Sequence, residues 1–172
     1  MNRLKNIVVG VDFSTRSKSA LLKAARLARQ NEAQLHVIHV VEEESAEDLA
    51  KRERRSPDGI RKELTASADE KMTTWTHEMG LLPGTSRGVA YGHPAEELVR
   101  KVEETKADLL LAGVRGISND ATGAGAQAKR FIRRAPCKVL LAEKDQSQAF
   151  ECVVAAIDFS ATSKRVVEQA IH

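Results

Sequence analysis

The residues of this 172-residue chain whose types and spacing could do chemistry are an aspartate and a group of glycines. Asp12 ends an apolar run that begins at Ile7, and a Gly-rich stretch covers residues 113–125. A glycine loop that leads into a helix offers backbone N–H groups and the positive end of a dipole to a phosphate, and a strand-end carboxylate can accept ribose hydroxyls. The combination is typical of a nucleotide site. The Gly-x-x-Gly pattern is common, however, and Asp12 could equally cap the following helix, so both roles are open.

A second candidate is a basic stretch toward the end of this region. Its members are Lys129, Arg130, Arg133, Arg134 and Lys138. Cations near the C-terminus of a solvated helix interact favourably with the helix dipole, which explains the stretch without any partner. Binding of nucleic acid or of an acidic partner is the alternative, and it predicts salt-dependent binding to duplex of random sequence.

Nothing in the sequence resembles a metal site or a nucleophilic centre. His36 and His39 differ by three positions in an expected strand, so their side chains point to opposite faces. No glycine loop ends in Lys-Ser/Thr, which disfavours a P-loop, and no Ser-His-Asp or Cys-His context is recognisable. The two cysteines, Cys137 and Cys152, are too few for a disulfide framework and indicate a reducing compartment.

The elements that must position these residues alternate between strands and helices. Short apolar runs, typical of strands buried on both faces, occupy 7–11, 35–41, 109–112 and 139–142, and a weaker edge strand is expected at 85–90. Segments with helical spacing separate them and begin near Thr15, Pro57, Pro94 and Ala128. The pattern predicts an open parallel α/β sheet with helices as crossovers.

Ligands in such sheets bind outside the carboxyl ends of the strands, where the connections change sides. For a strand order of 3-2-1-4-5, this point lies between the first and the fourth strand, whose ends carry Asp12 and Gly113. The sequence therefore predicts a ligand crevice between these two strand ends.

Four finer expectations concern the helices. Ser14 or Thr15 is expected to cap the first helix, and 42–55, which changes from acidic to basic, is interpreted as a solvated segment that contains some helical turns. Trp75 lies on an apolar stripe and is predicted to be a packing residue. The last helix is predicted to turn inward the four apolar residues Ala128, Phe131, Ile132 and Ala135.

Composition excludes several classes of protein. The chain is 42% hydrophobic and 30% charged with a formal net charge of +3, as in an ordinary globular protein. Aromatic residues make up 3%, which argues against a base-stacking platform for single-stranded nucleic acid. No apolar run approaches the ~18 residues of a membrane span or the h-region of a secretory signal, so a cytoplasmic protein is expected.

The sequence contains one strong internal repeat. Residues 7–26 align without gaps with residues 153–172, and Asp-Phe-Ser occurs at 12–14 and again at 158–160. We therefore predict one domain at 1–146, followed at 147–172 by a linker and by the first strand and partial helix of an incomplete second domain. An apolar strand from Val153 without partners is expected to dock on another chain's sheet edge or to stay disordered.

Six segments together resemble the universal stress protein family over residues 4–143. They are KNIVVGVDFS (5–14), HVV (39–41), GHPAEEL (92–98), ADLLL (107–111), GVRG (113–116) and RAPC (134–137). The resemblance implies a Rossmann-like fold with an open parallel five-stranded sheet of order 3-2-1-4-5, helices on both faces, and a role in stress tolerance. It also implies a homodimer through the last strand, or a pseudo-dimer with a second such domain. The lack of a long apolar run and the low aromatic content argue against a membrane or a nucleic acid as partner.

ATP-binding members of this family resemble Gly-x2-Gly-x9-Gly-Ser/Thr after the fourth strand. Gly113 and Gly116 match the first pair, but eight residues separate Gly116 from Gly125, and Ala126 stands where a hydroxyl is expected. A lost hydrogen bond to a charged group costs about 1.5–3 kcal/mol, which weakens such a site without abolishing it. ATP is therefore kept as a candidate ligand.

By the same resemblance, Asp12 and the backbone near Val40 would hold the adenosine side, and these positions match. The leading hypothesis is a non-enzymatic stress-response domain that dimerises and senses a small ligand at the crevice between strands 1 and 4. One alternative is an ATP-binding switch with slow hydrolysis. A second alternative is a binding module that uses the basic helix at 129–138.

Overall fold

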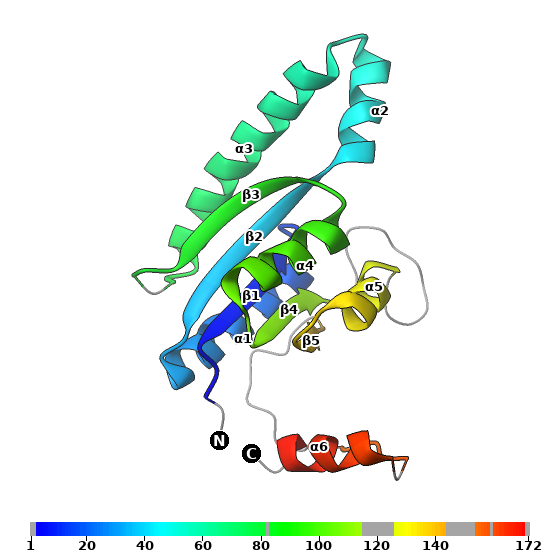
Figure 1. Ribbon diagram of the computed structural model, residues 1–172. Coiled ribbons are helices and arrows are strands. Elements are labelled where there is room, and N and C mark those ends of the chain that lie inside the picture. The colour runs from blue at the N-terminus through cyan, green and yellow to red at the C-terminus, as the bar shows by residue number, and fades with distance from the viewer. Residues whose placement is uncertain (1–2, 82, 115–125, 144–153, 159, 171–172) are drawn as a thin grey trace.

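Five parallel strands form the central sheet of the computed structural model, which describes residues 3–81, 83–114, 126–143, 154–158 and 160–170 (Figure 1). The strands are β1 (Asn6–Val11), β2 (Gln34–Glu42), β3 (Ser86–Gly92), β4 (Leu109–Gly113) and β5 (Lys138–Ala142). Their order is β3-β2-β1-β4-β5, and every neighbouring pair is parallel. The predicted Rossmann-like α/β fold and strand order are confirmed, with β3 at an edge as expected.

Helices cover both faces of the sheet, which is why the strands between them are apolar on both sides. On one face, α1 (Thr15–Asn31) and α3 (Pro57–Glu78) pack Leu21 and Met72 against Val9. On the other face, α4 (Pro94–Thr105) and α5 (Ala126–Arg134) pack Leu98 and Phe131 onto the sheet. In Figure 1, α1 lies behind the sheet and α4 in front of it.

Local sequence sets the start of α1. Ser14 is the N-cap, and its hydroxyl accepts a hydrogen bond from the Ser17 N–H at 3.2 Å. Ser14 is one of the two residues predicted for this role, and a side-chain oxygen at the N-cap satisfies one of the unpaired N–H groups of the first turn. At the other end, Glu32 takes the left-handed conformation and its N–H bonds the carbonyls of Ala28 and Arg29.

The segment predicted to be solvated is a packed helix, α2 (Glu43–Glu53), which follows directly on β2. Ala46 and Ala50 are buried against Ile60 of α3. The helical turns expected at 42–55 are present and most of these residues are exposed, as predicted; the close packing of Ala46 and Ala50 on α3 was not predicted. Together α2 and α3 extend beyond the end of the sheet (Figure 1).

The inward face of α5 is narrower than predicted. Ala128 and Phe131 are buried, but Ile132 is 58% exposed, so its assignment to the core was wrong. Ile132 follows Phe131 by one position, about 100° around the helix, so it lies off the face that Phe131 packs on the sheet. The basic side chains of α5 are exposed, and Arg134 pairs with Glu96 at 3.1 Å.

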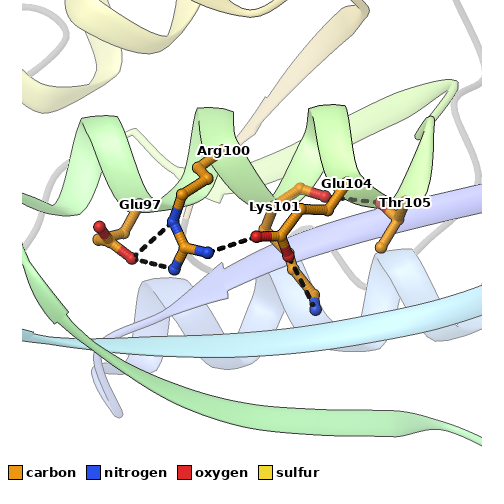
Figure 2. Close-up of polar contacts among 5 residues, drawn as sticks. All are labelled: Glu97, Arg100, Lys101, Glu104 and Thr105. Atoms are coloured by element: carbon orange, nitrogen blue, oxygen red, sulfur yellow. Dashed lines mark hydrogen bonds and ion pairs between the residues drawn. The ribbon is translucent and has the colours of Figure 1, made fainter.

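Helix α4 separates an apolar inner face from a charged outer face. Gly10 of β1 allows its close approach, because a Cβ at this position would lie 2.7 Å from Cδ1 of Leu98. On the outer face, Arg100 donates to Glu97 at 2.5 Å and also to Glu104, which forms a ladder of ion pairs along the helix (Figure 2). The helix is thus anchored by packing on one side and solvated on the other.

The C-terminal part of the chain carries the helix α6 (Ala161–Ala170), but 154–158 forms no strand. The expected strand has no partner strand among the described residues of this single chain, so its docking on another chain's sheet edge stays a prediction. The matching residues of the repeat differ sharply in exposure. Val166 and Val167 are 37% and 38% exposed, while the equivalent Ala20 and Leu21 of α1 are fully buried.

Candidate functional site

Strands β1 and β4 stop pairing before their carboxyl ends. The register of β1 with β4 ends at Val9↔Leu111, although β1 stays paired with β2 as far as Val11↔His39 and β4 stays paired with β5 as far as Gly113↔Ala142. The last two residues of each strand are therefore unpaired on the side where the other strand lies. This divergence is at the place where the sequence predicted a crevice, and we call it the β1/β4 switch point.

Asp12 is the first residue after β1 at this point, and it is half-buried. Its Oδ1 accepts a hydrogen bond from the Ser14 N–H at 3.0 Å, which closes a turn directly before α1. Ser14, not Asp12, is therefore the helix cap, and Asp12 stabilises the position of Ser14 through this hydrogen bond. Its Oδ2 has no hydrogen-bond partner among the described residues, so this oxygen is available to accept from a ligand.

Phe13 joins Asp12 to Ser14 in an unusual conformation. Its φ is +61°, in the left-handed region, which costs a residue with a bulky side chain about 1–2 kcal/mol. Its ring lies 4.5 Å from the ring of His39 and 5.5 Å from that of Trp75, and Nζ of Lys71 lies 4.5 Å from its centroid. We call these four residues the Phe13 cluster. The predicted packing role of Trp75 is confirmed.

His39 ties the end of β1 to β2. Its Nδ1 lies 2.8 Å from the carbonyl oxygen of Val11, and because that oxygen can only accept, Nδ1 carries the proton. Burial lowers the pKa of His39, while the Val11 carbonyl and the Asp12 carboxylate oppose this shift and Lys71 adds to it. The side chain is therefore held neutral by its surroundings and acts as a structural donor.

The structure brings three of the predicted site positions to one edge of the sheet. Since Val11 is level with His39, Asp12 follows at the level of Val40, which is half-buried against the α4 side. Gly113 ends β4, and the N–H of Val114 donates to the Ala142 carbonyl at 3.0 Å, which draws the chain along β5 and away from β1.

The remaining predicted positions belong to the glycine loop. Gly116 and Gly125 lie outside the described residues. Ala126 is the first residue of α5, and only its backbone is described. The N-terminus of α5 thus follows the loop that starts at the end of β4, which is the arrangement that offers N–H groups to an anion.

Sequence reasoning missed the Phe13 cluster. A phenylalanine carries no local sign of a left-handed backbone, and Lys71 and His39 come from different elements. The one available signal was the recurrence of Asp-Phe-Ser at 12–14 and 158–160. The predicted placement of His36 and His39 on opposite faces agrees with the structure, since His36 is level with Val8 of the α4-side core.

Comparison with known proteins identifies the family. The model of the universal stress protein family matches residues 3–143. The chain belongs to this family. A universal stress protein from Methanocaldococcus jannaschii is 30% identical over 149 residues, which are 86% of this chain and 86% of that protein.

Solved structures agree with the fold of this universal stress protein. Hypothetical protein MJ0577 matches with a TM-score of 0.72 and 20% identity, over 84% of this chain and 99% of its own. A universal stress protein in complex with cAMP matches with a TM-score of 0.54 and 25% identity, over 81% of this chain and 97% of its own. Both matches cover most of each chain.

Two other features bear on the range of functions. Among the residues that the structure describes, no three His, Cys, Asp or Glu side chains are grouped so that they could hold a metal ion. In the same part of the chain, every helix is too short or too polar to cross a lipid bilayer.

Proposed function

We propose that this universal stress protein binds an adenine nucleotide at the β1/β4 switch point and acts in the stress response through binding rather than catalysis. The observation that carries the proposal is the end of β1–β4 pairing at Val9↔Leu111, with the Asp12 carboxylate directly beyond it. The relative that is 25% identical and was solved in complex with cAMP supports the same class of ligand.

Each part of the site suits one part of a nucleotide. Oδ2 of Asp12 can accept a hydrogen bond from a ribose hydroxyl, and the backbone near Val40 lies at the same level for the base. The N-terminus of α5 offers a phosphate backbone N–H groups and the positive end of the helix dipole.

A mononucleotide fits this chain better than ATP. Ala126 supplies no hydroxyl to a phosphate, and the spacing from Gly116 to Gly125 is one residue short of the ATP-binding pattern. An ATP-binding switch with slow hydrolysis is the alternative. Comparing AMP, cAMP and Mg-ATP as ligands separates the two, since the alternative requires ATP to bind most tightly.

The first prediction tests the site through Asp12. Asp12→Asn keeps an oxygen that can accept from the Ser14 N–H but removes the charge, so the turn should survive while a hydrogen bond to the ligand weakens. A hydrogen bond to a charged group is worth about 1.5–3 kcal/mol, so we expect AMP affinity in titration calorimetry to fall at least about tenfold.

The matched control is Asp158→Asn, which changes the equivalent aspartate of the repeat and should leave the affinity unchanged. The proposal is wrong if the wild-type protein binds none of the three nucleotides at millimolar concentration. It is also wrong in its choice of site if both variants bind AMP as tightly as wild type.

We also propose that two copies associate through the β5 edge, as the family resemblance implies. One side of β5 has no neighbouring strand in the described sheet, and Ile132 of α5 is 58% exposed beside it. An unpaired apolar edge is a place where a second strand can add. The basic face of α5 remains the alternative binding surface.

A further inference from the structure

The chain contains the motif Asp-Phe-Ser-x-x-Ser twice, at Asp12–Ser17 and at Asp158–Ser163. In both copies, the first serine N–H donates to Oδ1 of the aspartate at 3.0 Å. The second copy makes this turn although 154–158 belongs to no sheet, so the turn is encoded by the motif itself.

The two copies differ in what the last serine binds. In the second copy, the Ser163 hydroxyl donates to Oδ1 of Asp158 at 2.7 Å and accepts from the Asp158 N–H at 3.0 Å. Hydrogen bonds from Ser160 and Ser163 hold the pKa of Asp158 at about 2. We call this arrangement the captured state, because the carboxylate is held against the start of its own helix.

In the first copy, the equivalent hydroxyl is turned elsewhere. Ser17 Oγ donates to the carbonyl oxygen of Ser14 at 3.0 Å and lies 3.5 Å from the Ser14 hydroxyl. Asp12 keeps its bond to the Ser14 N–H and makes none to Ser17. We call this the released state. Both serines are buried, Ser17 at 2% and Ser163 at 8% exposure, so each hydroxyl needs a protein partner.

In the first copy, the motif is surrounded by the Phe13 cluster. The ring of Phe13 packs on His39 of β2 and on Trp75 and Lys71 of α3, elements that the segment 154–170 does not contain. These contacts fix a left-handed backbone between Asp12 and Ser14. A residue persists in such a conformation where its surroundings over-determine it.

We propose that Phe13 is a positioning residue that holds this motif in the released state, in which the Asp12 carboxylate is not drawn onto the Ser17 hydroxyl and Oδ2 keeps the direction in which it can accept from the nucleotide. The inference rests on the proposed function for its ligand. It assigns Phe13 no contact with that ligand. In the captured copy both serines bond Oδ1 of Asp158, so capture by Ser17 would change where the Asp12 carboxylate points rather than occupy Oδ2.

The test is a double-mutant cycle with AMP as the probe. Phe13→Gly removes the ring and permits any backbone conformation, and we expect the affinity to fall about tenfold. Ser17→Ala removes the capturing hydroxyl; alone it should change the affinity less than about twofold, and in Phe13→Gly it should restore most of the loss. Phe13→Tyr, which keeps the ring, should bind like wild type.

A merely structural role for Phe13 would not give this pattern, because Ser17→Ala cannot replace lost packing. The inference is overturned if Phe13→Gly binds AMP as wild type does, or if Ser17→Ala fails to restore binding. Should Phe13→Gly not fold, Phe13→Asn takes its place, since asparagine tolerates the left-handed region.

A ligand-free crystal structure of Phe13→Gly gives a second readout. The inference expects the Asp12 carboxylate within hydrogen-bond distance of Ser17 Oγ, as Asp158 is of Ser163 at 2.7 Å. An Asp12 side chain that stays where it is in the wild type would contradict it. This result is independent of nucleotide, so a protein that binds no AMP would refute the proposed function and still decide the role of Phe13.

Discussion

At the scale of single residues, the two histidines of β2 show how the same side chain takes two roles. His39 has a carbonyl partner at the switch point, whereas both ring nitrogens of His36 are buried with no hydrogen-bond partner among the residues that the structure describes. Burial lowers the pKa of His36, and the charge of Lys101 lowers it further. A buried polar group without a partner costs about 1–3 kcal/mol of stability, so His36 is a weak point of the α4 side.

The lowered pKa of His36 predicts how the stability of the fold changes as the pH falls. The folded-state pKa of His36 lies below the ordinary value of 6.5, so the unfolded chain takes up the proton first as the pH falls. The stability should therefore decrease as the pH falls below about 6.5, and His39 should contribute in the same direction.

His36→Leu removes the proton site and fills the space with an apolar group. We expect it to raise the free energy of unfolding by about 1–3 kcal/mol at neutral pH and to make the loss between about pH 7 and pH 5 smaller. Urea unfolding at both pH values measures this. A variant with the wild-type pH dependence would show that His36 does not titrate in this range.

At the scale of elements, β1 and β4 are joined at one end and parted at the other. At the amino end, Oδ2 of Asp108 accepts from the backbone N–H groups of Lys5 at 2.6 Å and Asn6 at 3.0 Å, and the Asp108 N–H donates to the Asn6 carbonyl. At the carboxyl end the pairing stops at Val9↔Leu111. The joined end keeps the two strands in one sheet, and the parted end is where we propose that the ligand binds.

Asp108→Ala should therefore weaken the fold and leave the ligand site in place. We expect a loss of about 1–3 kcal/mol in the free energy of unfolding, with AMP affinity unchanged in the fraction that is folded. Asp108→Asn should lose less, because its amide oxygen still accepts from one N–H.

The pKa of Asp108 also determines in which direction its contribution to stability changes with pH. Burial opposes ionisation of Asp108, but the bonds from Asn6 and Lys5 outweigh it and the pKa lies below 3.8. The contribution of Asp108 is present above the unfolded pKa and is lost as the pH falls through the folded pKa. Wild type and Asp108→Ala should therefore converge in stability in strong acid, and a difference that persists there would contradict this account.

Helices and strands were predicted correctly where the sequence pattern was local. The prediction failed where contacts with a neighbouring element determine the packing or the backbone. Apolar runs buried on both faces predicted the strands, the family resemblance implied their order, and Ser14 predicted the start of α1. The packing of α2 rests on Ala46 and Ala50, whose pattern stands out only once Ile60 is known to face them. At the site, Asp12 could be predicted from its place after a strand, but Phe13 could not, because contacts from β2 and α3 impose its backbone.

At the scale of the whole molecule, two places have apolar groups that are only partly covered in the described structure. They are the C-terminal helix α6, which belongs to the second copy of the repeat, and the unpaired edge of β5. Val166 and Val167 of α6 are partly exposed where their counterparts in α1 are buried by a sheet. We propose that 147–172 opens a second universal stress protein domain, in support of which the Asp158–Ser160 turn has the same geometry as Asp12–Ser14. Such a domain, or a second copy of this chain, is the partner expected at β5.

The last prediction tests the β5 edge through Ile132. Its side chain is 58% exposed, so Ile132→Asp should not disturb the core, yet it places a charge beside the edge where a second copy would pair. In sedimentation velocity, we expect wild type to be a dimer at micromolar concentration and Ile132→Asp to be a monomer with the same melting temperature. The control is Leu22→Asp, since Leu22 is 36% exposed on α1, across the sheet from α5, and its replacement should leave the dimer intact. A wild-type protein that is a monomer at all these concentrations would refute the proposed association, and a dimer that survives Ile132→Asp would place the interface elsewhere, because a carboxylate cannot be buried against an apolar edge without a partner.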